Sequence, residues 1–65
     1  MEYRGTITGG SALNLWMVEC PDAPPPLQTM FLRTPAFPVA IGLRVVVRYT
    51  SDRSYGMWNI VEVLP

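Results

Sequence analysis

Five short apolar segments follow one another along this chain, separated by stretches rich in glycine, proline, serine and aspartate. The first and fourth segments alternate between apolar and polar residues, which is the period of a β-strand with one buried face. Short strands at such spacing are typical of a small all-β domain. We therefore expect residues 1–65 to form a single domain, a small five-stranded β-barrel. The expected strands are residues 2–8, 13–20, 27–34, 42–50 and 57–64.

The second and third expected strands carry apolar side chains on both faces. Only one face can enter the core of so small a barrel, so the other must meet a ligand, a loop or another subunit. We therefore expect this chain to form a homo-oligomer or to bind a partner protein. The side chains concerned are Leu13, Leu15 and Met17 against Trp16, Val18 and Cys20 in the second strand, and Leu27 and Phe31 against Met30 and Leu32 in the third.

The fourth expected strand has the most regular pattern. Val45 and Val47 should be buried, while Arg44 and Arg48 should face solvent or a partner. In the fifth strand the apolar residues break strict alternation, so we expect a bulge within residues 60–63.

Two proline-rich stretches connect the strands. Residues 21–26 should form an extended, exposed and stiff connector, although a triple proline can also be a docking peptide for aromatic grooves. Residues 35–41 should form an irregular crossover, because prolines so placed prevent a regular helix. Phe37, Val39 and Ile41 would then close one end of the barrel.

Four stretches carry a resemblance to a known architecture. They are Gly5-Thr6-Ile7, Phe31-Leu32-Arg33, Gly42-Leu43-Arg44-Val45-Val46-Val47 and Ile60-Val61-Glu62-Val63. With a glycine hairpin after the first strand and an irregular link between the third and fourth, the pattern resembles the OB-fold, particularly its cold-shock-domain form. An SH3-like barrel has the same strand count and a similar length, and it is the second interpretation.

The resemblance implies a binding face for single-stranded nucleic acid on strands two and three. In an OB-fold the loops after strands one and four flank that face, which would bring several aromatic and arginine side chains together. Residues 14–19 depart from the cold-shock pattern, because they hold one tryptophan, no glycine-aromatic repeat and a negative charge. The candidate binding residues are Trp16, Phe31, Arg33, Arg53, Tyr55 and Trp58.

The charge balance favours a protein partner over nucleic acid. Five arginines are offset by five carboxylates, so the formal net charge is zero and no long-range field attracts a polyanion. Tryptophan, tyrosine, methionine and arginine are enriched at subunit interfaces, whereas lysine, which this chain lacks, is depleted there. We therefore expect a self-associating interaction module, with weak binding of single-stranded nucleic acid as the alternative.

Few side chains could support catalysis or hold a metal. The chain has no histidine, and its single cysteine, Cys20, lies beside Glu19 and near Asp22, whose charges disfavour the reactive thiolate. These three side chains would also make a poor metal site. We expect no enzymatic activity, no catalytic residue, no metal and no cofactor.

The same sequence sets expectations about location. One cysteine excludes an intramolecular disulfide and makes the cytoplasm the default compartment. The apolar runs are too short to span a membrane, and residues 1–4 lack the pattern of a signal peptide. We expect a complete, soluble, cytoplasmic chain with no membrane partner.

Overall fold

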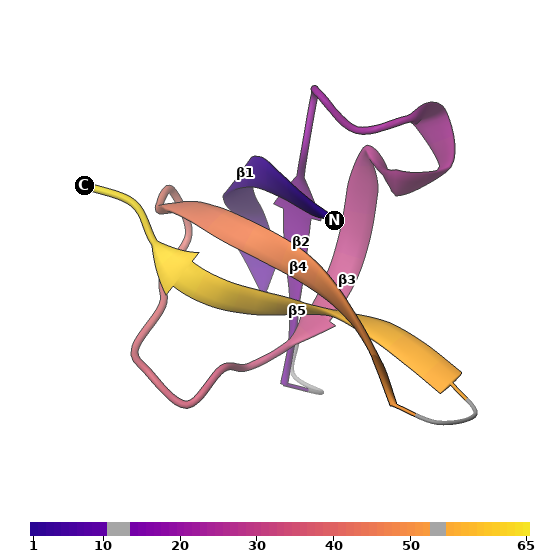
Figure 1. The fold of residues 1–65 in the computed structure, drawn as a ribbon. Coiled ribbons are helices and arrows are strands. Elements are labelled where there is room, and N and C mark those ends of the chain that lie inside the picture. Colours follow the sequence, from indigo (N-terminus) through magenta and orange to yellow (C-terminus); the bar gives the residue numbers. More distant parts are fainter. Residues whose placement is uncertain (11–13, 53–54) are drawn as a thin grey trace.

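The computed structural model describes residues 1–10, 14–52 and 55–65, without the side chains of Asp52 and Tyr55. Five antiparallel strands form one sheet in the order β3-β2-β1-β4-β5, which confirms the all-β prediction (Figure 1). Within the described residues β3 and β5 form no ladder with each other, so the sheet is not closed into a barrel. The strands are β1 (Glu2–Gly10), β2 (Leu15–Glu19), β3 (Thr29–Arg33), β4 (Arg44–Asp52) and β5 (Tyr55–Val63), with a short 3-10 helix, η1 (Pro25–Leu27), before β3.

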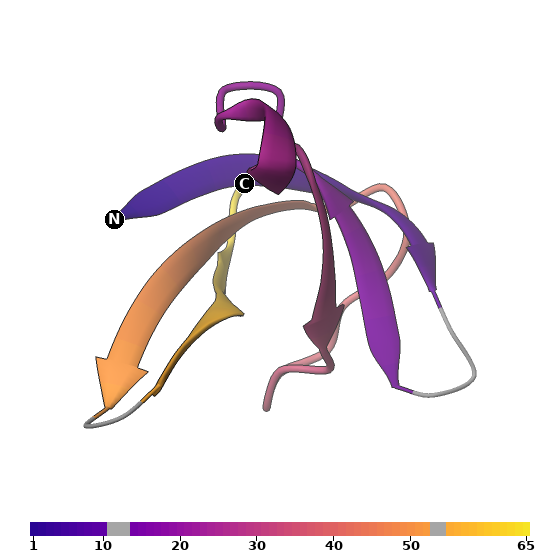
Figure 2. The same ribbon diagram turned by 90° about the vertical axis from the view of Figure 1, so that its right-hand side faces the viewer.

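The strand order follows from one long connection. Strands β1, β2 and β3 are neighbours in sequence and in the sheet, whereas residues 34–43 cross over so that β4 pairs with β1. Three consecutive strands with a fourth returning beside the first make a Greek key. Figure 2 shows the result as an arch, with β4 and β5 on one side and β2 and β3 on the other.

The core fills the inner side of this arch. Val45 and Val47 are fully buried, whereas Arg44 and Arg48 are exposed, as their alternation predicts. The expected bulge in β5 is also confirmed, because Val46 pairs with Glu62 but Val47 pairs with Ile60, which leaves one extra residue on β5. The largest fully buried side chains are Ile7, Val18, Val45, Val47 and Cys20.

A glycine on β1 allows a close approach to the end of β2. A Cβ atom at Gly5 would lie 2.6 Å from the Sγ atom of Cys20 and 2.8 Å from the backbone oxygen of Glu19. A side chain at this position would therefore push β1 away from the end of β2. Glycine lets the two strands approach closely where the sheet curves over the core.

The connection between β2 and β3 differs from the extended, exposed stretch that we predicted. Residues 25–27 form η1, and Ala23 is buried with an exposed fraction of 4%. Leu27 packs against the core and does not share a face with Phe31. The reason is that this connection folds back over the end of the sheet, where the Ala23 amide donates to the Cys20 carbonyl at 3.0 Å.

The crossover before β4 matches the prediction in part. Phe37 and Val39 pack against the core, but Ile41 is 62% exposed, so its assignment to the core was wrong. The chain turns there, with the Leu43 amide donating to the Ala40 carbonyl at 3.3 Å, and Gly42 has a φ of 98°. Ile41 lies in this turn and therefore stays outside the core.

Candidate functional site

The solvent side of β2 and β3 carries large apolar side chains. Val18 on β2 and Met30 and Leu32 on β3 are buried in the core. Because successive side chains of a strand point to opposite faces, the residues between them point to the solvent side. Phe31 is 65% exposed there. We call this surface the outer β2–β3 face, and its residues are Leu15, Met17, Glu19, Thr29, Phe31 and Arg33.

An apolar strip crosses the middle of this face. Met17 pairs with Phe31 on β3 and with Gly9 on β1. A Cβ atom at Gly9 would lie 3.5 Å from the Cε atom of Met17, so the methionine side chain lies close over the glycine. Within the part of the chain that the structure describes, Leu15, Met17 and Phe31 do not belong to the core cluster. Phe31 is therefore the exposed part of the strip, and Leu15 and Met17 beside it are half-buried.

Opposite charges lie at the two ends of the strip. Arg33 pairs with Leu15 at one end, and Glu19 pairs with Thr29 at the other. Both charged residues are exposed, and among the described residues neither forms an ion pair. The outer β2–β3 face thus has a basic end, an apolar centre and an acidic end.

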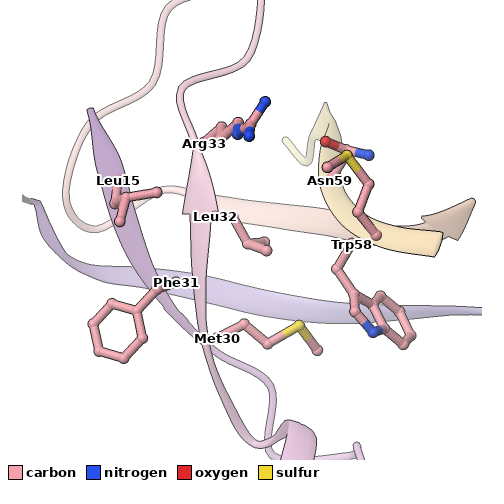
Figure 3. A pocket seen from close by; sticks show the side chains of 8 residues that line it. Leu15, Met30, Phe31, Leu32, Arg33, Trp58 and Asn59 are labelled. Carbon is pink, nitrogen blue, oxygen red and sulfur yellow. The ribbon is translucent and has the colours of Figure 1, made fainter. Parts of the chain in front are cut away.

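A cleft of about 280 Å³ lies between the two edge strands β3 and β5. Figure 3 shows Met30 and Leu32 turned toward β5 and Trp58, whereas Phe31 is turned to the opposite side of β3. The cleft is mostly apolar and continues from the core to the surface. Its lining residues are Leu15, Met30, Phe31, Leu32, Arg33, Met57, Trp58 and Asn59.

The structure separates Trp16 from Phe31. Trp16 lies on the inner face, where it pairs with Leu32 and packs against the core. Its Nε1 atom donates a hydrogen bond to the Oγ1 atom of Thr34 at 3.0 Å, and that hydroxyl donates to the Asn14 carbonyl at 3.2 Å. Trp16 therefore holds the start of the crossover against β2 and does not share a surface with Phe31.

Trp58 belongs to an aromatic group that the sequence analysis missed. Its ring centroid lies 5.5 Å from that of Tyr3 and 5.3 Å from that of Tyr49, with tilted ring planes. The sequence held a signal for this group. In the alternating pattern of their strands, Tyr3 lies on the same face as Ile7, and Tyr49 lies on the same face as Val47. Two tyrosine rings already contact Trp58, so less of its indole surface is open to a ligand.

Of the remaining candidate binding residues, two lie on the outer β2–β3 face. Phe31 and Arg33 lie together on the outer β2–β3 face and line the cleft. Arg53 lies outside the described residues, and Tyr55 is described only as the first residue of β5. The structure therefore brings together two of the six predicted residues, with Trp58 across the cleft from them.

The thiol of Cys20 lies inside the core. Cys20 is fully buried, and burial raises the pKa of its thiol, so the nucleophilic thiolate is disfavoured. No group of three histidine, cysteine or carboxylate side chains in the described ranges is placed to hold a metal ion. Nor does any described helix have the length and apolar character needed to span a membrane.

A comparison of the chain with protein-family models, curated proteins and solved structures finds no significant match.

Proposed function

We propose that this chain is a non-enzymatic interaction module that self-associates through the outer β2–β3 face. The observation that carries the proposal is the strip formed by Phe31, Met17 and Leu15. Phe31 is 65% exposed in the single chain. Fully burying a phenylalanine or methionine side chain contributes about 1.5–3 kcal/mol. A second surface that covers this strip would gain part of that contribution, because Phe31 is already partly buried and Leu15 and Met17 are half-buried.

The contrast with the rest of the outer surface supports a specific role. On β1 and β4 the outward residues include Glu2 and Arg48, whose Oε2 and Nε atoms form an ion pair at 2.8 Å. An exposed ion pair thus lies on the outer side of β1 and β4, whereas the exposed ring of Phe31 lies at the centre of the outer β2–β3 face. Exposed apolar patches on small soluble domains often mark interaction sites.

We also propose that the sheet is a partly open barrel of the OB type. The Greek-key order, with β4 beside β1 and β3 facing β5, supports this interpretation over the SH3-like one. A buried free cysteine is compatible with a reducing compartment, and we propose a cytoplasmic location on that basis.

Weak binding of single-stranded nucleic acid is the second candidate function. The exposed ring of Phe31 beside Arg33 favours it, because one ring could stack on a base while the guanidinium contacts a phosphate. Glu19 on the same face and a net charge of zero weigh against it, since binding would release few counterions. The inner position of Trp16 further reduces the stacking surface.

Sedimentation and light scattering over protein concentrations from about 10 µM to about 1 mM test self-association, a range that brackets weak dissociation constants. We expect the mass to rise from monomer to dimer. Phe31→Ser should keep the chain monomeric with an unchanged circular dichroism spectrum. Ile41→Ser is the matched control, because Ile41 is 62% exposed but lies in the crossover, and this variant should still dimerise.

Two outcomes would overturn the proposal. One is a wild-type chain that stays monomeric at 1 mM, and the other is a dimer that survives Phe31→Ser but not Ile41→Ser. An oligothymidine titration at low salt covers the second candidate. Saturable binding that is lost in Arg33→Ala, from a wild-type chain that stays monomeric, would favour nucleic acid.

A further inference from the structure

We propose that the outer β2–β3 face binds the same face of a second copy in an antiparallel arrangement, so that Arg33 of each copy meets Glu19 of the other. This inference rests on the proposed self-association and adds the arrangement of the two copies. It is carried by the order of charges along β2 and β3.

Three cross-strand pairs follow one another along this face. Leu15 pairs with Arg33, then Met17 with Phe31, and then Glu19 with Thr29. Successive pairs on one face are about 7 Å apart along the strands. The positive and negative ends are therefore about 14 Å apart, with the Met17–Phe31 pair midway between them.

A twofold axis makes this pattern complementary to itself. We place the axis in the plane midway between the two faces, perpendicular to the strands and above the Met17–Phe31 pair. The strands of the second copy then run in the opposite direction to those of the first. Met17 and Phe31 of one copy then meet Met17 and Phe31 of the other, and the basic end of each copy meets the acidic end of the other. Such isologous contacts are the commonest way in which identical chains pair.

The separation of packed sheets suits these side chains. Sheets stacked face to face lie about 10 Å apart. An extended arginine and a glutamate side chain together can span that gap from opposite faces. The alternative axis, parallel to the strands, would place the arginines of the two copies near each other, and like charges at an interface disfavour binding.

Two observations favour a second copy over other occupants. Glu19 lies on the same face as Arg33, so a polyanion would meet a carboxylate next to its binding strip. The edge of β3 is also not open to another strand, because β5 contacts it and the cleft residues of β5 lie across it. Face-to-face contact leaves the fold of each copy unchanged.

The face is small, so the predicted dimer is weak. Two strands of five residues, about 4.8 Å apart and with a rise of about 3.4 Å per residue, cover much less than the roughly 800 Å² per partner of a standard interface. We expect dissociation constants in the range of about 10 µM to about 1 mM. The charge pairs should then contribute mainly to the choice of orientation.

Charge reversal tests the arrangement. Sedimentation equilibrium is measured for the wild type, Arg33→Glu, Glu19→Arg and the double variant that carries both changes. Each single reversal should weaken the dimer by about tenfold or more, because it places like charges opposite each other. The double variant restores opposite charges at both contacts and should return to within about threefold of the wild type. Glu62→Arg, on the exposed face of β5, is the control and should leave the dimer unchanged.

The outcomes separate this inference from the proposed function. If the wild type is monomeric at 1 mM, both fail. If the wild type dimerises but the double variant is no better than the single reversals, self-association stands and the antiparallel arrangement is wrong. If neither single reversal weakens the dimer, Arg33 and Glu19 do not meet across the interface, and the antiparallel arrangement is wrong. Circular dichroism of each variant confirms that the fold is retained.

Discussion

The two faces of β2 and β3 are similar in composition but differ in what covers them. Val18, Met30 and Leu32 point into the arch, where residues of β1, β4 and β5 pack against them. Met17 and Phe31 are as apolar, yet Phe31 is 65% exposed and Met17 is only half-buried. Hydrophobicity alone therefore does not decide which face of a strand becomes core. The crossover and the curvature of the sheet decide it, and the face left over becomes available to a partner.

The largest expected difference between the two faces is in stability. Leu32→Ala removes a core side chain that is 5% exposed and should cost about 2–5 kcal/mol of unfolding free energy. Phe31→Ala, one residue away on the outer face, should cost less than about 1 kcal/mol, because an exposed side chain loses few contacts. Urea unfolding at low concentration, followed by circular dichroism, measures both values. Equal losses would mean that Phe31 is part of the core and not of an interface.

A smaller effect concerns the thiol on the inner face. Burial raises the pKa of Cys20, so the native chain holds this proton more tightly than the unfolded chain does. Below the ordinary thiol pKa of about 8.5 the contribution to stability is complete, and it is lost as the pH rises toward the raised native value. We expect the urea midpoint to fall between pH 7.5 and 9.5 more steeply in the wild type than in Cys20→Ala. The same slope in both proteins would contradict a buried thiol.

The smallest expected effect lies on the charged half of the outer surface. Glu2→Gln removes the ion pair with Arg48, in which both side chains are half exposed. Exposed pairs contribute about 0.2–1 kcal/mol, so the thermal midpoint should change little and the dimer should be unaffected. A scan of thermal unfolding with a parallel measurement of mass checks both statements. Loss of the dimer in Glu2→Gln would move the interface from β2 and β3 to β1 and β4.

Local patterns in the sequence predicted much of this fold. The alternation around Val45 and Val47 predicted the buried face of β4, and the broken alternation in residues 60–63 predicted the bulge. The sequence also predicted that β2 and β3 are apolar on both sides. Each of these features depends on neighbouring residues of one strand, and local patterns report them directly.

Features that depend on distant parts of the chain were not predictable in this way. The outward position of Phe31 depends on the crossover that places β4 and β5 on the other side of the arch, facing the inner side of β2 and β3. Ile41 fits an apolar pattern but lies in a turn whose backbone bonds to β1, since the Gly42 amide donates to the Ile7 carbonyl at 2.7 Å. Trp16 suggested a stacking platform, but it pairs with Leu32 and packs against the core on the inner face. Tertiary contacts therefore decided the candidate site.

A concentration series of two-dimensional NMR spectra tests the central claim most directly, because it maps the contact surface in the unmodified chain. Between about 20 µM and 1 mM, which spans the expected weak dissociation constants, we expect the amide signals of Met17, Phe31 and Arg33 to shift together. The signals of Glu2 and Arg48, on the other half of the sheet, should stay constant. Shifts confined to β4 and β5, or no shifts at all up to 1 mM, would contradict an interface on the outer β2–β3 face.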